Sequence, residues 1–246
     1  MSRIALVTGA SGGIGKATAL RLAEDGWTLA LFARSADKLE DVAEACGEDS
    51  TAHPCDVSDP DQVGAAFADL ELAHGRLDFV FNNAGNNVPS TNFGDLDFDA
   101  WRHVLSVNLD GAFLVANFAY RMMREQDPQG GRILNNGSIS AHVPRPGSAP
   151  YTSSKHAITG LTRSIALDGR AHGIACGQID IGNAASEMTE KMKSGVPQPD
   201  GSSRVEPVMD VANVAGHVAH IADLPAEANV LFTTIMASDM PFVGRG

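Results

Sequence analysis

Cysteine is scarce in this sequence of 246 residues, and this scarcity excludes some kinds of stabilising and metal-binding site. The three cysteines, Cys46, Cys55 and Cys176, are odd in number and form no CxxC pair, so neither a disulfide framework nor a zinc site is expected. His217 and His220 lie one helical turn apart, but no carboxylate or cysteine cluster accompanies them. The sequence therefore predicts no metal site.

Basic residues and long apolar runs are also few. The 18 Lys and Arg residues, against 30 Asp and Glu, give a net charge of −12 and form no cluster, which argues against nucleic-acid binding. No signal-peptide core or cleavage site opens the chain, and no apolar run approaches the roughly 20 residues of a membrane-spanning helix. We therefore expect a cytoplasmic protein without a membrane or nucleic-acid partner.

Short apolar runs alternate with helical patterns throughout the chain. Strands are expected at residues 4–8, 27–33, 50–55, 77–81, 132–137, 173–179 and 229–236. No linker or repeat interrupts the alternation, so the sequence predicts one α/β domain over 1–246, a Rossmann-type doubly wound parallel sheet of about seven strands. Residues 182–207 are rich in Gly, Ser, Pro and Met. A lid over a ligand is expected there, with a disordered insertion as the alternative.

A glycine-rich turn, Gly9-Ala-Ser-Gly-Gly-Ile-Gly15, stands between the first strand and a helical pattern. Glycines at such a turn let backbone amides and the helix N-terminus approach a pyrophosphate closely. A plain tight turn is the alternative, which the position between strand and helix disfavours. Contacts with a dinucleotide are therefore expected from Gly9, Ser11, Gly12, Gly13, Ile14 and Gly15.

The second strand ends without the acidic residue that would bind an adenosine ribose. Ala33 stands there and Arg34-Ser35 follows, which offers a cation and a hydroxyl to a 2′-phosphate. We therefore expect NADP(H) to be preferred, with NAD(H) possible. Arg34 as a solvated loop cation is the alternative. Further cofactor contacts are expected where the third and fourth strands end, at Asp56, Val57, Asn83, Ala84 and Gly85.

Tyr151 and Lys155 are four residues apart and follow Pro150, which is typical of the first turn of a helix. On a helix the phenol and the ammonium share a face, and a nearby positive charge lowers a tyrosine pKa from its usual value near ~10. Ser138, at the end of the fifth strand, would hold a substrate oxygen beside the phenol. A solvated helix face is the alternative for this pair taken alone.

A long helical pattern runs from Phe98 to Arg124 and is interrupted at Gly111. Asn108 lies within it, where a side-chain amide can bond a carbonyl, bend the helix and leave room for a water.

In order and spacing these residues resemble the short-chain dehydrogenase/reductase family over nearly the full length. The resemblance rests on Thr8 to Gly15, Asp56-Val57, Asn82 to Gly85, Asn108, Ser138, Tyr151 and Lys155. It implies a catalytic tetrad of Asn108, Ser138, Tyr151 and Lys155 acting with a nicotinamide cofactor. Tyr151 would exchange a proton with the substrate oxygen that Ser138 positions. Lys155 would lower the phenol pKa and bind the nicotinamide ribose, and Asn108 would hold a water.

Two segments depart from the family pattern. Members usually carry Pro-Gly and then a threonine after the sixth strand, where Cys176-Gly177 and Ile181 stand here. The backbone of Ile179 is still expected to meet the nicotinamide carboxamide, with Gln178 or Asn183 compensating for the lost threonine. The apolar tail, residues 240–243, lacks the usual acidic residue and glycine pair and is expected to form a subunit contact or a pocket wall.

The substrate is expected to be a ketone or a secondary alcohol with an apolar part. Ser138 and Tyr151 would bind its oxygen, and His142 and Met188 would border it. Met192, Val88 and Val143 add apolar surface. By resemblance, the helices over 98–124 and 151–171 would pair subunits into a homo-oligomer, a dimer or tetramer.

Two other functions remain open from the sequence. Sugar-nucleotide epimerases and dehydratases share the Tyr and Lys spacing but need a larger C-terminal domain, and about 75 residues follow Ala171. An NADP-sensing regulatory protein with little turnover is the second, although such proteins tend to lose the tyrosine or lysine.

Overall fold

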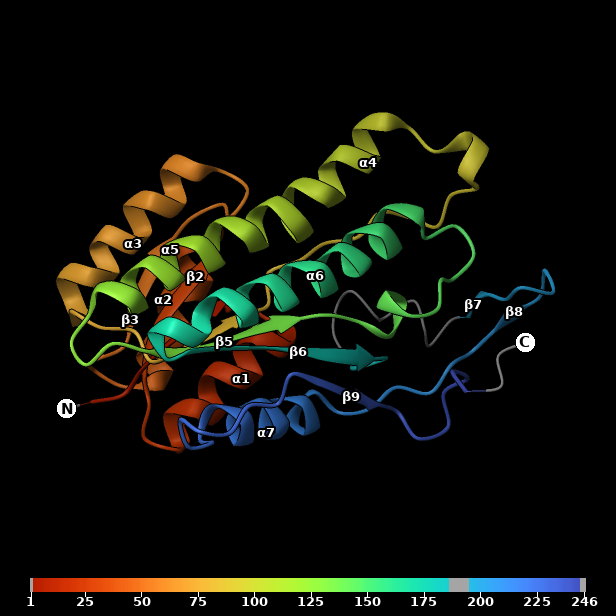
Figure 1. The fold of residues 1–246 in the computed structure, drawn as a ribbon. Coiled ribbons are helices and arrows are strands. Elements are labelled where there is room, and N and C mark those ends of the chain that lie inside the picture. The colour runs from red at the N-terminus through yellow and green to blue at the C-terminus, as the bar shows by residue number, and fades with distance from the viewer. Residues whose placement is uncertain (1, 186–194, 244–246) are drawn as a thin grey trace.

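A computed structural model describes residues 2–185 and 195–243. Seven parallel strands form one sheet in the order β3-β2-β1-β4-β5-β6-β9 (Figure 1). The chain therefore starts in the middle of the sheet, builds outward to one edge and then to the other. The strands are β1 (Ile4–Thr8), β2 (Thr28–Ala33), β3 (Thr51–Pro54), β4 (Phe79–Asn82), β5 (Gly131–Asn136), β6 (Ile174–Gly182) and β9 (Phe232–Met236).

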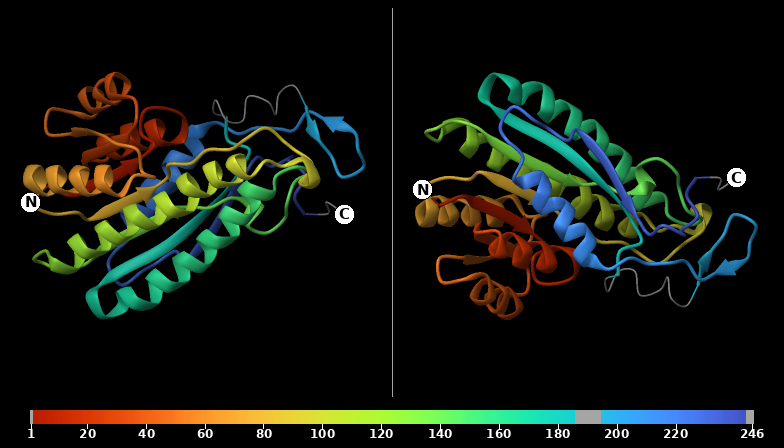
Figure 2. Two further views of the ribbon diagram at one scale, coloured as in Figure 1. Left: turned by 90° about the horizontal axis from the view of Figure 1, so that it is seen from above. Right: turned by 90° about the horizontal axis from the view of Figure 1, so that it is seen from below.

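Helices cover both faces of the sheet, as Figure 2 shows from above and below. One face carries α1 (Gly13–Glu24), α2 (Ala36–Cys46) and α7 (Val211–Ala222). The other carries α3 (Pro60–His74), α4 (Phe98–Leu105), α5 (Ala112–Glu125) and α6 (Ala149–Asp168). This arrangement confirms the predicted doubly wound fold.

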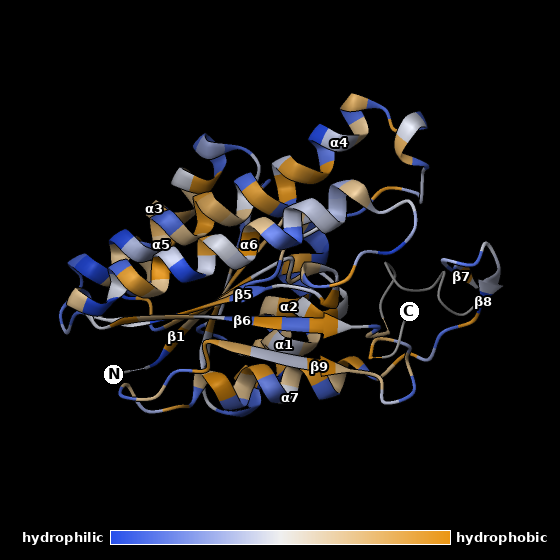
Figure 3. Ribbon diagram, turned by 45° about the vertical axis from the view of Figure 1, so that its right-hand side comes forward, coloured by the Kyte–Doolittle hydropathy of each residue, from blue (hydrophilic) through white to orange (hydrophobic). Residues whose placement is uncertain are grey.

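The strands are apolar on both faces because each face meets a helix layer. Val7 and Leu31 pack toward α1, α2 and α7, whereas their neighbours Leu6 and Phe32 pack toward α3 and α5. All four side chains are fully buried. Hydrophobic colour accordingly concentrates along the strands in Figure 3, while the outer helices alternate between hydrophilic and hydrophobic positions.

The sixth strand is longer than predicted. β6 runs to Gly182, three residues beyond the predicted end at Ile179. Asp180 interrupts the apolar run in the sequence, which suggested an end to the strand. In the structure its carboxylate is buried and accepts hydrogen bonds from Ser138 and Gln178, so the strand continues through it.

The predicted lid contains a small antiparallel ribbon of β7 (Val196–Pro197) and β8 (Ser203–Arg204). The ribbon projects beyond the carboxyl ends of the sheet strands (Figures 1 and 2). Residues 186–194 of the predicted lid, including Met188 and Met192, lie outside the described ranges.

The long helical pattern continues through its predicted interruption. α4 and α5 are joined by a π-helical turn, η2 (Ser106–Gly111), which contains Asn108. A Cβ at Gly111 would lie 2.9 Å from Cγ2 of Val57, so glycine permits the helix to pass close to the segment after β3. Single π turns inside helices are frequent at functional sites.

Short 3-10 turns complete the chain: η1 (Phe93–Asp95), η3 (Ile139–Ala141) and η4 (Gly169–His172). Among the described helices, none is both long enough and apolar enough to pass through a bilayer.

Candidate active site

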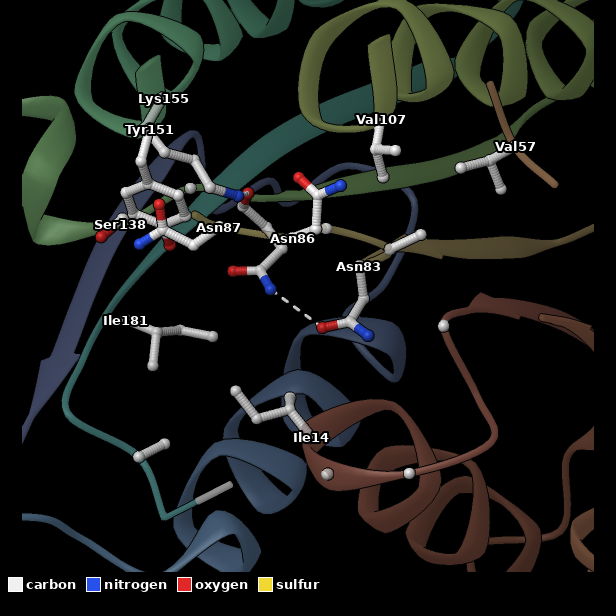
Figure 4. A pocket seen from close by; sticks show the side chains of 18 of the residues that line it. Ile14, Val57, Asn83, Asn86, Asn87, Val107, Ser138, Tyr151, Lys155 and Ile181 are labelled. Atoms are coloured by element: carbon white, nitrogen blue, oxygen red, sulfur yellow. Dashed lines mark hydrogen bonds between the residues drawn. The ribbon is translucent and has the colours of Figure 1, made fainter. Parts of the chain in front are cut away.

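A cavity of about 460 Å³ lies at the carboxyl ends of the strands, where parallel α/β sheets bind ligands. The loops after β1, β2, β3, β4, β5 and β6 all contribute to its wall. Figure 4 shows Tyr151, Lys155 and Ser138 gathered at one side and Ile14 and Ile181 at another. The predicted cofactor and catalytic residues that line this cavity are Gly9, Ser11, Gly12, Gly13, Ile14, Arg34, Ser35, Asp56, Val57, Asn83, Ala84, Gly85, Ser138, Tyr151 and Lys155.

The glycine turn between β1 and α1 is held by close backbone contacts. Gly9 and Gly13 adopt φ angles of +65° and +52°, which glycine tolerates best. A Cβ at Gly15 would lie 2.2 Å from the carbonyl oxygen of Gly9, so Gly15 lets α1 pack against the turn without lining the cavity. Around Gly12, by contrast, a Cβ would meet nothing within 4 Å. The turn therefore leaves open space beside its amides and the N-terminus of α1.

Asp56 and Arg34 both line the end of the cavity beside β2 and β3. The Asp56 carboxylate accepts hydrogen bonds from the amide and hydroxyl of Ser58, at 2.9 and 2.7 Å. Burial acts to raise the pKa of Asp56, but these bonds and the Arg34 charge together hold it below its ordinary value. Arg34 itself is exposed. This end of the cavity thus contains a carboxylate and a cation accessible to a ligand.

The turn after β4 is pinned to β1 and β5. The Thr8 hydroxyl, fully buried, accepts hydrogen bonds from the amides of Asn83 and Ala84, both at 2.8 Å. The Asn83 side chain donates to the Thr8 carbonyl at 2.9 Å and accepts from Asn136 at 2.9 Å, the dashed line in Figure 4. Asn83, the second of the paired asparagines, therefore connects the ends of β1, β4 and β5.

Tyr151 lies in the first turn of α6, and Lys155 lies one turn later. The Lys155 Nζ is 5.5 Å from the centre of the Tyr151 ring and donates a 2.7 Å hydrogen bond to the carbonyl of Asn136. The Ser138 Oγ accepts the amide proton of Ser140 at 3.1 Å, and Ser138 lines the cavity together with Tyr151. The predicted side-by-side placement of these three residues is thus what the structure shows.

The surroundings of the Tyr151 phenol do not lower its pKa, as the lysine spacing had predicted, but raise it. Burial raises the pKa of Tyr151, a hydrogen bond from Ser138 and the charge of Arg145 act to lower it, and Asp180 acts to raise it further. Burial also lowers the pKa of Lys155 to about 8, against an opposing effect of Asp180. In the protein without a ligand, desolvation therefore outweighs the expected activation of the phenol by the lysine.

Asn108 is buried behind the cavity wall. Its Oδ1 accepts the amide of Asn86 at 2.7 Å and its Nδ2 donates to the carbonyl of Asn86 at 2.9 Å. A further contact, 3.4 Å long, runs from Nδ2 to the hydroxyl of Ser154. Both polar atoms of Asn108 are thus engaged, so it fixes Asn86, which lines the cavity. The expected binding of a water at Asn108 stays a prediction.

The end of β6 requires a correction. Because the strand extends to Gly182, Cys176 and Gly177 lie inside it, and Ile179 is fully buried in the core on the α7 side. The Ile179 carbonyl accepts the Gly137 amide at 2.8 Å, and Ile179 does not line the cavity. Its expected contact with a carboxamide is therefore wrong. Ile181, Asn183 and Ala184 are the residues of this segment that do line the cavity.

The two expected substitutes for the missing threonine differ in position. Gln178 is fully buried and bonds Thr159 and Asp180, away from the cavity. Asn183 adopts a φ of +48° at the cavity wall, where its Oδ1 accepts from Arg145 at 2.9 Å and its Nδ2 donates to Glu206 at 2.9 Å. Only Asn183 of this pair reaches the site.

His142 is also placed differently from the expectation. It does not line the cavity; its Nε2 lies 2.7 Å from Oδ2 of Asp180. Val88 and Val143, expected to add apolar surface, do not line the cavity either. Met240 of the tail is buried against Gly182 and Ile139, so the tail supports the wall from behind, within its own subunit.

Several residues that line the cavity were not singled out from the sequence. Arg145, in the loop before α6, pairs with the buried carboxylate of Glu206 at 2.7 Å. The signal was an arginine midway between Ser138 and Tyr151, but its partner lies 61 residues away in sequence and could not be identified without the fold. Others are polar or small residues at the strand exits, namely Asn86, Asn87, Asn136, Ser140 and Ser148.

Comparison with known proteins agrees with this geometry. A family model described as short chain dehydrogenase matches residues 3–197. The chain belongs to this family. It is 34% identical over 197 residues to a 3beta-hydroxysteroid dehydrogenase of Mediterraneibacter gnavus, a match covering 79% of this chain and 70% of the relative. It is 37% identical over 194 residues to a gluconate 5-dehydrogenase of Gluconobacter oxydans, covering 76% and 73%.

A solved structure extends the match to nearly the whole short-chain dehydrogenase fold. An alcohol dehydrogenase from the archaeon Thermococcus sibiricus, complexed with 5-hydroxy-NADP, superposes with a TM-score of 0.82 at 25% identity. The superposition covers 96% of each chain. As a member of this family, the protein is an NAD(P)-dependent oxidoreductase of the class that acts on CH–OH groups.

Proposed function

We propose that this protein interconverts a ketone and a secondary alcohol with NADP(H), using Tyr151 as the proton-transfer residue. The observation that supports this most is the meeting of Ser138, Tyr151 and Lys155 with the glycine turn in one cavity. Such a cavity can hold a dinucleotide along the strand ends and a small substrate at the phenol.

The residues present fit a nicotinamide dinucleotide. The open space beside Gly12, bounded by the N-terminus of α1, suits a pyrophosphate. Asp56 and Val57 would meet the adenine, and Asn83 to Gly85 and Lys155 would line the nicotinamide ribose. When bound, such a cofactor supplies or accepts the hydride.

Proton transfer would be the task of the chain itself. During reduction the Tyr151 phenol gives its proton to the substrate oxygen while the carbonyl carbon gains a hydride, and during oxidation both move in reverse. The Ser138 hydroxyl would donate to the same oxygen, since its contact with the Ser140 amide uses a lone pair and leaves its proton free. The Lys155 ammonium, fixed on the Asn136 carbonyl, would favour the phenolate form.

The preference for NADP(H) over NAD(H) rests on the end of β2. Ala33, Arg34 and Ser35 line the cavity there, and no acidic residue stands among them. Arg34 also faces Asp56, so a 2′-phosphate would compete with this carboxylate for the guanidinium. The archaeal alcohol dehydrogenase is complexed with an NADP derivative, which supports this choice.

The carboxamide anchor also gains a candidate from the corrected strand. Because β6 ends at Gly182, Ile181-Gly182 replaces Cys176-Gly177 as the match for the family's Pro-Gly pair. The residue five positions after Ile181 is Ser186, which has a hydroxyl. Ser186 lies outside the described ranges. We therefore assign the family's threonine position to Ser186 in preference to Ile181.

The substrate end of the cavity is more polar than expected. Its described lining includes Asn86, Asn87, Arg145 and Asn183 as well as Ile181. A ketone or secondary alcohol with further oxygen substituents fits this wall better than a purely hydrocarbon one. The relatives named above, a hydroxysteroid dehydrogenase and a gluconate dehydrogenase, include both kinds of substrate.

The test is a panel of ketones and secondary alcohols, steroid and polyol compounds included, assayed with NADPH, NADH and their oxidised forms. We expect turnover with at least one compound and a higher kcat/KM with the phosphorylated cofactor. Tyr151→Phe should lower kcat by about 10²–10⁴-fold and leave the NADPH Kd within about twofold, because a general acid contributes of that order. Binding of NADPH without any turnover would support the alternative of an NADP sensor.

We also propose that the protein is a homo-oligomer, a dimer or tetramer. Phe98, Phe113 and Leu167, on α4, α5 and α6, expose 69%, 50% and 61% of their surface. Large apolar side chains exposed on one helix layer are of the kind that a subunit contact covers. Light scattering after size exclusion should give a mass above the 25.7 kDa of one chain, and Phe113→Lys should lower it. A monomeric wild type would contradict this proposal.

A further inference from the structure

Asp180 is a buried carboxylate beside the catalytic residues with no role assigned so far. It is 1% exposed near the carboxyl end of β6. Oδ1 accepts from the Ser138 amide at 2.9 Å and from the Gln178 side chain at 2.7 Å. Oδ2 lies 2.7 Å from Nε2 of His142, which must donate because a carboxylate only accepts. A carboxylate without these bonds would be strongly destabilising at this position.

The contacts of Asp180 join the two ends of one short turn. Ser138 precedes the 3-10 turn η3 and His142 follows it, so both flanks of this turn are tied to the same carboxylate. Gly137 makes room for this arrangement, because a Cβ there would lie 2.1 Å from Oδ1 of Asp180. The turn that presents the Ser138 hydroxyl is therefore fixed from the sheet.

The charge of Asp180 also faces the catalytic groups. The Asp180 carboxylate acts on Tyr151 and Lys155, which lie on α6, and it contacts His142, which follows η3. Its neighbour on β9, Thr234, is uncharged. Arg145 acts on Tyr151 with the opposite sign. The carboxylate acts to raise the pKa of both Tyr151 and Lys155.

We propose that Asp180 is a positioning residue for the reaction, which with His142 clamps the turn bearing Ser138 and places a negative charge behind the tetrad. This inference rests on the proposed function, because it assigns Asp180 a part in the same proton transfer. Neither residue needs to touch the substrate, since both act through Ser138, Tyr151 and Lys155.

Two variants separate the effect of the hydrogen bonds that Asp180 accepts from the effect of its negative charge. Asp180→Ala removes the acceptor, so kcat should fall by about tenfold to hundredfold through misplacement of Ser138, with the NADPH Kd little changed. Asp180→Asn keeps an acceptor oxygen and removes the charge. The pKa of Tyr151 and that of Lys155 should then both fall, and the alkaline limb of the kcat profile for reduction should move to lower pH. A purely structural residue would leave this limb in place.

Histidine variants test the second arm of the clamp. His142→Ala should lower kcat, whereas His142→Gln, which restores a donor at similar reach, should recover most of it. His156→Ala is the matched control, because His156 is exposed on α6 and its Nδ1 only meets the carbonyl of Thr152. Wild-type kcat in both Asp180→Ala and His142→Ala, or an unmoved limb in Asp180→Asn, would overturn the proposal.

A readout independent of turnover distinguishes failure of the clamp from failure of the proposed function. Hydrogen exchange of the Ser138 amide should be faster in Asp180→Ala than in wild type, because the amide loses its acceptor. If the wild type turns over no compound of the panel, the proposed function fails, and this exchange rate still tests the clamp. An unchanged exchange rate would contradict it.

Discussion

The two ends of the cavity are formed by different kinds of chemical group. The nucleotide end is made of glycines and backbone amides after β1 and of the pinned turn after β4, where side chains act mainly as connectors. The catalytic end is made of buried polar side chains, Lys155, Asp180 and Glu206 among them, each held by hydrogen bonds. The first end depends on close approach, the second on charge and hydrogen bonding, so they should respond to different changes.

After Tyr151→Phe, the largest effect is expected at the catalytic end from Ser138→Ala. Removing a hydroxyl aimed at the reacting oxygen should lower kcat by about 10²–10³-fold, the effect of losing one such donor. NADPH affinity, measured by fluorescence titration, should change little because the glycine turn is untouched. Equal losses in kcat and in affinity would contradict the separation of the two ends.

At the nucleotide end, Gly15→Ala should act only through a steric clash. Its Cβ would collide with the carbonyl of Gly9, at 2.2 Å, and overpacking of this kind costs about 1–3 kcal/mol. We expect weaker NADPH binding and a lower midpoint of thermal unfolding.

Gly160→Ala is the matched control for Gly15→Ala. A Cβ at Gly160, exposed on α6, meets nothing within 4 Å, so this change should stabilise slightly. If Gly15→Ala binds NADPH as tightly as Gly160→Ala does, the close-approach account of the turn is wrong.

Arg34→Gln tests the one charged contact proposed at the nucleotide end. Losing a charge-assisted bond to the 2′-phosphate should weaken NADPH binding by about tenfold and leave NADH binding nearly unchanged. The ratio of the two dissociation constants is the measurement. An unaltered ratio would mean that Arg34 is a solvated loop cation.

The smallest effect concerns the buried charge of Lys155. Its pKa falls from 10.5 to about 8 in the native chain, so between these values the unfolded state binds more protons and stability rises with pH. Without nucleotide, the unfolding free energy of wild type relative to Lys155→Met should rise by about 1 kcal/mol from pH 7 to pH 9. Urea unfolding of both proteins measures this, and a flat or falling difference would contradict it.

The same division explains what the sequence could predict. β1 with its glycine turn, and the Tyr151–Lys155 pair on α6, follow from local periodicity and spacing, and the structure places them as predicted. The end of β6 could not be predicted, because Asp180 is compatible with a buried strand only through Ser138, Gln178 and His142.

Contacts across long sequence distances were likewise out of reach. The pairing of Arg145 with Glu206 depends on the fold that brings the two loops together. The pKa of Tyr151 also depends on the fold, since the spacing to Lys155 implies a lowered value and burial raises it.

Transfer of an isotopic label tests the central claim most directly. NADPH with deuterium at both C4 positions of the nicotinamide would be incubated with the best ketone of the panel and either wild type or Tyr151→Phe, and the product would be analysed by mass spectrometry. We expect one deuterium on the carbinol carbon from wild type, and almost no alcohol from Tyr151→Phe although this variant still binds NADPH. Unlabelled alcohol from wild type, or labelled alcohol at the wild-type rate from Tyr151→Phe, would contradict it.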